Sequence, residues 1–211
     1  MQTGYCTIEA YAQDEFVEKK SRFIGAVYPC KTEEEALWFV EKKKKQYWDA
    51  SHNVYAYVVR QEGRAPLARC SDDGEPQGTA GRPVLDVLER GNLVDCCVVV
   101  TRYFGGTLLG TGGLVRAYGH GAKLAIEAAH VLHMEPAKRC QLSFDYSLYG
   151  KLQALFPEFG AVLEDTAFGA DVTLTFRIRE DRFAAFEKAL TEKTNGTLQA
   201  TVLETLFADM P

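Results

Sequence analysis

The residues of this chain that could do chemistry are concentrated in two loops of its first half. One of them, residues 105–113, holds five glycines in nine residues: Gly105, Gly106, Gly110, Gly112 and Gly113. We expect it to lie between a buried strand and a helix start, where free backbone N–H groups and the positive helix end can hold an anion. Arg102 and Arg116 flank the loop and would strengthen an anion site if they converge on it.

The glycine-rich loop matches neither of the common phosphate-binding fingerprints. No Gly-Lys-Ser/Thr follows it, so it is not a Walker A loop, and the third small position of the dinucleotide fingerprint is Val115. Its glycines could also serve only to permit tight turns and close packing of a helix on a strand. The sequence leaves both interpretations open, the anion site and the purely structural loop.

The second loop, residues 71–83, clusters three carboxylates: Asp72, Asp73 and Glu75. Hard cations such as Mg²⁺ accept such ligands, but the alternating acidic positions of an EF-hand are absent. Asp-Gly and Glu-Pro are also ordinary turn formers. We therefore expect a turn or a partner-contacting loop here rather than a metal site.

The histidines do not complete a catalytic set. His52 precedes a strand, and the adjacent Ser51 cannot easily face it on an extended segment, which disfavours a Ser-His-Asp triad. His130 and His133 are three apart on an expected helix, a spacing that can bind metal, but no third ligand is evident. We therefore expect a docking site rather than a catalytic centre, and no cofactor.

The composition is that of a globular protein, with 46% hydrophobic and 25% charged residues in a chain of 211. The N-terminus lacks the pattern of a signal peptide, and no segment approaches the roughly 18 apolar residues of a membrane helix, so we expect a cytoplasmic location. The net charge is −5, and neither half is basic: Lys+Arg against Asp+Glu is 16 against 18 for residues 1–136 and 8 against 11 for 137–211. This balance disfavours a general nucleic-acid binder but leaves a local basic patch open.

The elements that position these loops form one α+β domain, residues 1–136. We predict strands at 5–11, 15–19, 22–28, 54–59 and 96–100. We also predict three helices: one from Thr32 toward Tyr47, one after the acidic loop that runs through Leu88, and one from 114 to 133. Thr32 and Glu35 form a capping box, and the order of Glu33–Glu35 before Lys42–Lys45 suits the helix dipole. Cys96 and Cys97 should point to opposite faces of their strand as buried thiols. Residues 134–138 are the expected linker.

Residues 137–211 predict a second domain with the order β-α-β-β-α-β, the ferredoxin-like pattern. Strands are expected at 141–146, 162–164, 172–178 and 198–202, with helices at 148–159 and 183–190. The outward positions of the third strand are Thr173, Thr175, Arg177 and Arg179 rather than the stacking aromatics of an RNA-recognition motif. We expect a solvated face there rather than a docking or phosphate-contacting surface.

Several segments of the first domain resemble the IMPACT/YigZ family. The resemblance rests on residues 20–24, 52–57, 72–83 and 99–118, in the family's order and spacing. It implies that residues 1–136 have the fold of the second domain of ribosomal protein S5, and that residues 137–211 resemble the C-terminal domain of elongation factor G. Eukaryotic relatives act in translational control, and they carry an extra RWD domain that this sequence lacks. The positions that carry over are Ser21, Arg22, His52, Asp72, Asp73, Glu75, Arg102 and the glycines, with Tyr103 and Arg116 beside them.

Three functions remain open at this stage. The first is a translation-associated binding protein that docks on the ribosome, its RNA or a translation factor through these loops. The second is a nucleotide- or phosphate-binding enzyme that uses the glycine-rich loop for phosphate and the acidic loop for Mg²⁺. The third is a protein-interaction module without RNA affinity. The first is the hypothesis that we carry forward.

Overall fold

The computed structural model describes residues 4–210 and forms two compact units. The first domain comprises Tyr5–Leu132, and the second comprises Gly4 with residues 133–210. The predicted linker at 134–138 is wrong, because these residues lie inside the long strand β7 (Val131–Phe144). No helix among the described residues is long and apolar enough to cross a membrane.

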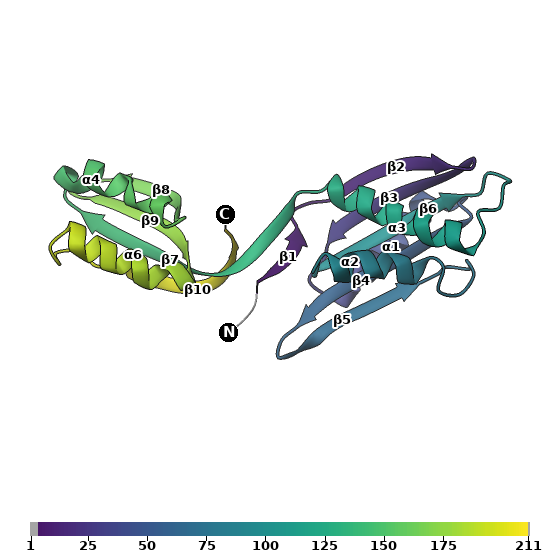
Figure 1. The fold of residues 1–211 in the computed structure, drawn as a ribbon, viewed down its shortest axis with the longest axis horizontal. Coiled ribbons are helices and arrows are strands. Elements are labelled where there is room, and N and C mark those ends of the chain that lie inside the picture. The colour runs from purple at the N-terminus through teal and green to yellow at the C-terminus, as the bar shows by residue number, and fades with distance from the viewer. Residues whose placement is uncertain (1–3, 211) are drawn as a thin grey trace. The chain divides into compact units, whose positions relative to one another are not determined.

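The first domain is built on an antiparallel sheet of five strands in the order β2-β3-β6-β4-β5 (Figure 1). The strands are β2 (Ala12–Glu18), β3 (Ser21–Pro29), β4 (His52–Gln61), β5 (Arg64–Ser71) and β6 (Cys96–Tyr103). A short strand, β1 (Tyr5–Ile8), precedes them. The sequence did not predict β5, whose Pro66 interrupts the strand pattern; the edge position of β5 explains how the proline is tolerated.

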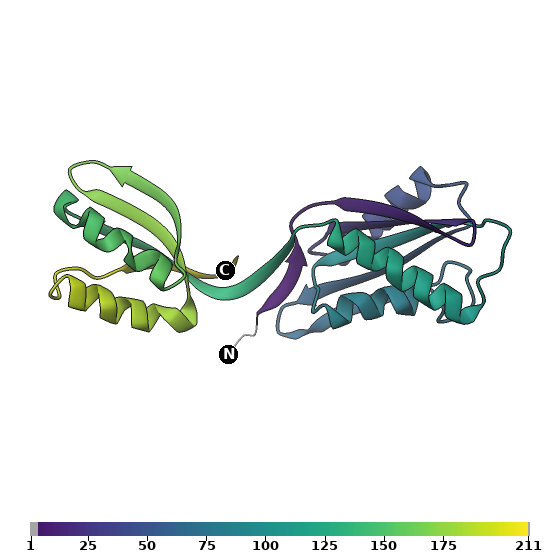
Figure 2. The same cartoon turned by 45° about the horizontal axis from the view of Figure 1, so that its top comes forward.

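Helices cover both faces of this sheet (Figure 2). On one face, α2 (Gly81–Arg90) and α3 (Thr111–Glu127) pack over a core that includes Cys96, Val98 and Val100. On the other, α1 (Glu33–Gln46) packs over Cys97 and Val99. The prediction that the two neighbouring cysteines point to opposite faces is confirmed.

The ends of the first-domain helices test two sequence predictions. The capping box of α1 is confirmed, because Thr32 Oγ1 accepts from the N–H of Glu35 at 3.2 Å and the Glu35 carboxylate accepts from the N–H of Lys31 at 2.6 Å. Helix α3 ends at Glu127, so the prediction that His130 and His133 share a helix is wrong. Their proposed metal-binding spacing on that helix therefore does not exist.

Lys43 differs from its neighbours in the lysine run of α1. Its side chain is buried, with a 2% exposed residue surface, and its Nζ donates to Tyr11 Oη at 2.8 Å and Gln13 Oε1 at 2.9 Å. No carboxylate pairs with it within residues 4–210. Burial, with a smaller contribution from Lys42, lowers the pKa of Lys43 to about 8.

The second domain confirms the ferredoxin-like order. Strand β7 lies between β9 (Val172–Arg179) and β10 (Thr201–Asp209), and β8 (Val162–Phe168) pairs with the other side of β9, all antiparallel. Helix α6 (Glu180–Lys193) is continuous. The predicted helix at 148–159 is instead divided into η1 (Tyr146–Leu148), α4 (Tyr149–Gln153) and α5 (Leu155–Glu158). Pro157 lacks the N–H that a continuous helix would need at this position.

The outward face of the second-domain sheet carries arginines that are neutralised by carboxylates. Glu164 pairs with Arg139 at 2.6 Å and with Arg177 at 2.8 Å, and Glu204 lies 3.4 Å from Arg139. This arrangement agrees with a solvated face and leaves these arginines poorly placed to contact phosphate. The two-domain α+β class is confirmed, and the first domain is consistent with the S5-like fold that the resemblance implies.

Candidate functional site

The carboxylate of Glu75 is the centre of a buried polar cluster in the first domain. Its Oε1 accepts from Arg102 Nη1 at 2.6 Å and from Tyr118 Oη at 2.7 Å, and His52 Nε2 lies 3.7 Å away. Arg102 Nη2 also lies 3.4 Å from Ser21 Oγ. We call these five residues (Ser21, His52, Glu75, Arg102 and Tyr118) the Glu75 cluster.

The Glu75 cluster joins five segments that are distant in sequence, with His52 at the start of β4. Glu75 comes from the acidic loop, Arg102 from β6, Tyr118 from α3 and Ser21 from the start of β3. Both partners of the central ion pair are buried, with side chains 6% (Arg102) and 4% (Glu75) exposed. Burial and the hydrogen bond to Glu75 raise the pKa of Tyr118, so the phenol stays a proton donor. This cluster fixes the acidic loop against the core.

The other two carboxylates of the acidic loop are also engaged by the protein itself. Asp72 accepts the backbone N–H groups of Gly78, Ala80 and Gly81 at 2.8, 3.0 and 2.8 Å. Burial alone would raise the pKa of Asp72, but these three hydrogen bonds outweigh it and the pKa is lowered. Asp73 accepts from the N–H of Asn53 at 2.6 Å.

Two further contacts hold Asp73 in place. Its carboxylate lies 3.2 Å from Lys44 Nζ, and its backbone carbonyl lies 2.8 Å from His52 Nδ1. The three acidic side chains thus turn toward separate partners. The described part of the chain contains no group of three or more His, Cys, Asp or Glu residues that could hold a metal ion.

The turn between β2 and β3 has an unusual backbone. Glu18 pairs with Ser21, so Lys19 and Lys20 alone connect the strands, and both have positive φ, 46° and 68°. Two-residue hairpin turns with this conformation strongly favour Asn-Gly, because a side chain here costs roughly 1–2 kcal/mol per residue. Neither lysine forms an ion pair with any residue from 4 to 210.

The glycine-rich loop lies directly against this turn. A Cβ on Gly105 would stand 2.0 Å from the backbone carbon and oxygen of Lys20, so only glycine allows this approach. The Gly105 N–H donates to Ser21 Oγ at 3.2 Å, which links the loop to the Glu75 cluster. Gly106 and Gly110 have positive φ, and Gly110 is the N-cap of α3. Leu108, between them, is 82% exposed.

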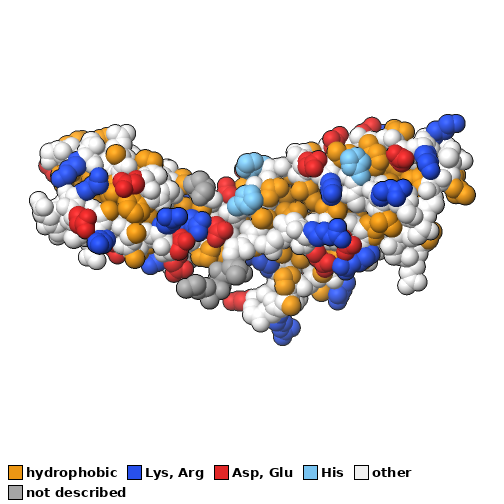
Figure 3. Space-filling model, viewed as in Figure 1, with side chains coloured by type: hydrophobic (Ala, Val, Ile, Leu, Met, Phe, Trp, Pro, Cys, Tyr) orange, Lys and Arg blue, Asp and Glu red, His pale blue; other side chains and the backbone are white. Residues whose placement is uncertain are grey.

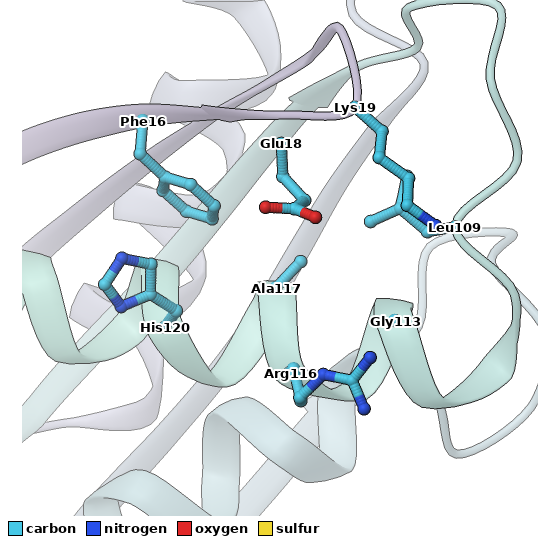
Figure 4. Close-up of a pocket in the computed structure, with 8 residues that line it drawn as sticks. All are labelled: Phe16, Glu18, Lys19, Leu109, Gly113, Arg116, Ala117 and His120. Carbon is cyan, nitrogen blue, oxygen red and sulfur yellow. The ribbon is translucent and has the colours of Figure 1, made fainter.

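A pocket of about 260 Å³ separates the β2–β3 turn from the first turns of α3 (Figure 4). Its basic lining residues include Lys19 and Arg116, and Gly113 belongs to it, while a Cβ on Gly112 would lie 3.6 Å from Arg116 Nη1. Arg102 does not line this pocket, because its guanidinium pairs with Glu75. The two arginines that flank the glycine-rich loop therefore do not converge on a common anion. The pocket is lined by Phe16, Glu18, Lys19, Leu109, Gly113, Arg116, Ala117 and His120.

Basic side chains gather at this end of the first domain (Figure 3). We call the surface formed by Lys19, Lys20, Leu108 and Arg116 the cationic rim. Arg116 is exposed and, like the two lysines, forms no ion pair within the described residues. Arg102, by contrast, is buried among the carboxylate and aromatic side chains behind the rim.

Arg22 and Tyr103 lie beside each other on the α1 side of the sheet. The Arg22 guanidinium pairs with Glu15 at 2.6 Å and lies 5.9 Å from the centroid of the Tyr103 ring. Tyr103 Oη donates to Asp49 at 2.8 Å. These two residues therefore belong to a different surface from the Glu75 cluster, although they are the sequence neighbours of its members Ser21 and Arg102.

Sequence reasoning missed several residues of this region as site residues. Lys19, Lys20 and Leu108 became notable only through their backbone and exposure, and Tyr118 only through its contact with Glu75. One signal was present: only two residues, Lys20 and Ser21, separate the expected strands 15–19 and 22–28, which is the length of a tight hairpin turn, and the observed turn lies one residue earlier. Lysines there give no turn signature of their own.

Comparison with known proteins relates both domains to one family. Residues 19–126 match the Impact N-terminal domain, and residues 142–197 match a domain of unknown function, DUF1949. The IMPACT family member YvyE of Bacillus subtilis is 39% identical over 92% of this chain and 88% of its own. YigZ of Escherichia coli, another family member, is 34% identical over 88% of this chain and 91% of its own.

A solved structure supports the same relationship over both domains. A crystal structure described as that of a hypothetical protein aligns with a TM-score of 0.60 at 31% identity, covering 97% of this chain and 99% of the other. The resemblance drawn from the motif residues is confirmed by these comparisons. The chain belongs to the IMPACT family.

Proposed function

We propose that this chain is a translation-associated binding protein that docks on the ribosome, its RNA or a translation factor through the motif loops of its first domain. Membership of the IMPACT family supports a translation-regulatory role. The contacts in the first domain support the cationic rim as the docking surface, with the Glu75 cluster holding its loops in place.

The observation that carries this proposal is the Lys19–Lys20 turn. Asn-Gly would form the same turn at lower energy, yet the chain has two lysines with φ of 46° and 68°. Backbone strain of this kind persists where the side chains are needed for function. Lys19 and Lys20 bring two ammonium groups without an ion pair to the end of the domain, beside the glycine-rich loop that carries the exposed Leu108.

The distribution of charge is the reason that an acidic chain can still bind phosphate here. The net charge is −5, but the carboxylates of Asp72, Asp73 and Glu75 are directed to internal donors. They therefore neutralise the cationic rim only weakly, and Glu18, which lines the pocket with Lys19 and Arg116, is the carboxylate that remains near the three cations. Unpaired cations that contact nucleic-acid phosphates release counterions, and their binding weakens with salt.

The competing enzyme hypothesis requires free carboxylates for Mg²⁺. In this structure each acidic side chain of the loop is already occupied by backbone N–H groups, Lys44, or the Arg102–Tyr118 pair. A phosphate-bearing small molecule would have only the open pocket between Lys19 and Arg116. Docking of a larger partner needs no rearrangement of the acidic loop, and for this reason we prefer it.

Co-sedimentation with ribosomes over a salt series tests the proposal. The rim variant Lys19→Gln/Lys20→Gln should bind more weakly at low salt, and its affinity should depend less steeply on salt, because about two phosphate contacts are lost. The matched control is Lys151→Gln/Lys188→Gln, which removes the same charge from exposed helix positions of the second domain. The control should bind as the parent does.

Two results would count against the proposal. Equal binding of the rim variant and the parent would exclude Lys19 and Lys20 from the interface. Absence of binding to ribosomes and RNA at any salt concentration would remove the translation-associated function, and screening by melting temperature with nucleotides and Mg²⁺ would then test the enzyme hypothesis. Binding that is insensitive to salt would indicate a protein surface as the partner.

A further inference from the structure

We propose that the first domain binds single-stranded nucleic acid, with a base stacked on Trp48 and the phosphates directed toward the β2–β3 turn. This inference rests on the proposed function and names the form of nucleic acid that the docking surface would accept. It depends on residues of the α1 side of the sheet, among which Trp48 lies outside the motif segments.

Trp48 is exposed to an unusual degree. Its relative exposure is 82%, although tryptophan is usually highly buried. It follows α1 in a turn held by two hydrogen bonds to the carbonyl of Tyr47, from the Ala50 N–H at 3.0 Å and from Asn53 Nδ2 at 3.3 Å. An exposed indole ring on a hydrogen-bonded turn offers a flat face on which a base can stack.

Residues that are neighbours in the chain or in the sheet lead from Trp48 toward the cationic rim. The neighbouring Tyr47 ring lies 6.5 Å from Tyr103 in an edge-on arrangement, and Tyr103 lies opposite Arg22 in the β3–β6 register. Arg22 is two residues from Lys20 in the strained turn. We call this series (Trp48, Tyr103, Arg22 and Lys20) the Trp48 track.

The charges along the Trp48 track favour a polyanion. Lys45 and Lys20 have no carboxylate partner in the described chain. Two acids belong to the same group of residues: Glu15 pairs with Arg22 at 2.6 Å and neutralises it, and Asp49 accepts from Tyr103 at 2.8 Å, so the free cations are the two lysines. The first domain thus combines an exposed ring at Trp48 with unpaired lysines at positions 20 and 45, the composition that binds single strands by stacking and backbone contacts.

Single strands fit this surface better than a duplex or an acidic protein. The bases of a duplex are stacked on one another and cannot lie on an exposed ring, whereas those of a single strand can. An acidic peptide would use the cations but would leave Trp48 without a stacking partner. Quenching of Trp48 fluorescence by bases separates these cases.

The chain allows this experiment without a label, because it has only two tryptophans. In a Trp38→Phe background, Trp48 is the sole tryptophan reporter, and the full-length protein is titrated with a short oligouridylate. Strong quenching that is reversed by salt is expected. An oligodeoxythymidylate of equal length, duplex RNA and polyglutamate are compared; the single strands should quench and the other two should not.

A second measurement uses a labelled oligouridylate and fluorescence anisotropy. Trp48→Leu should weaken binding about five- to a hundred-fold, the range measured for loss of one stacked base. Trp38→Phe should bind as the parent does. The high exposure of Trp48 means that this substitution leaves the core intact, which a melting curve verifies.

The outcomes separate this inference from the function on which it rests. Ribosome binding without quenching of Trp48 by single strands would overturn the inference and leave the proposed function in place. Absence of both ribosome binding and quenching would overturn both the inference and the proposed function. Quenching by polyglutamate or duplex RNA as strong as by oligouridylate would also overturn it, since neither places a base on the indole.

Discussion

The Glu75 cluster and the cationic rim are adjacent, but the charges of the cluster are buried and paired, whereas those of the rim are exposed and unpaired. In the cluster, Arg102 is buried and its charge is met by Glu75 at 2.6 Å. In the rim, Lys19 and Lys20 are exposed, strained and without an ion pair in the described chain. The two meet where Ser21 accepts from Gly105. The comparison indicates that the motif residues divide into those that hold the loops and those that can contact a partner.

The largest effect is expected from breaking the buried ion pair. Arg102→Met leaves the Glu75 carboxylate buried without its main charged partner, and such a loss costs about 3–5 kcal/mol of stability. The free energy of unfolding of the first domain in urea measures it. Arg102→Met combined with Glu75→Gln should recover part of the loss, because the unpaired charge is gone.

A change in stability below about 1 kcal/mol for Arg102→Met would contradict this account of the cluster. It would mean that Glu75 is neutral or solvated in the folded protein. Arg102 would then be free to contact a partner, and the division between the cluster and the rim would fail.

A smaller effect is expected where the cluster and the rim touch. Gly105→Ala places a methyl group 2.0 Å from the Lys20 backbone, and relief of this clash requires the loop or the turn to move, at about 1–3 kcal/mol. Gly150→Ala is the control, because that position is open and in a helix. Thermal melting compares them; equal melting temperatures would show that the loop and the turn are not in contact.

Much of the fold could be predicted from the sequence, because hydrophobic periodicity determines it. The alternation of Val172, Leu174, Phe176 and Ile178 gave β9, and Thr32 with Glu35 gave the start of α1. The failures occur where one residue overrides the pattern. Pro66 obscured β5, Pro157 divides the expected helix, and the turn after Glu127 removed His130 and His133 from α3.

The site was harder to predict, because its contacts join distant segments. Residue types identified Glu75 and Arg102 as candidates but not as partners 27 positions apart. The sequence also does not show which side chains are exposed. The lysine run of α1 contains one buried member, Lys43, between solvated neighbours. Lys43 extends the comparison, since it is buried like Arg102 but lacks a carboxylate.

The smallest effect is expected at this unpaired buried lysine. Lys43→Met keeps the aliphatic contacts and removes a buried charge, so stability should rise by about 1 kcal/mol near pH 7. Because the folded pKa is lowered to about 8 from an ordinary value of 10.5, the unfolded chain binds more protons between these values. The stability of the parent should therefore rise with pH across this window.

Urea unfolding of the parent and of Lys43→Met across this pH window measures the effect. The advantage of the variant should shrink as the pH rises toward 10.5, because the unfolded parent loses its proton as well. An advantage that does not change with pH would show that the charge of Lys43 is not the source of the difference.

We propose that the chain keeps a strained turn for the sake of its two lysines. Lys19→Asn/Lys20→Gly tests it most directly, with the melting temperature and ribosome co-sedimentation measured on one preparation. We expect a more stable protein, because Asn-Gly suits the turn, together with weaker binding to ribosomes. A more stable protein that binds ribosomes as strongly as the parent would contradict it.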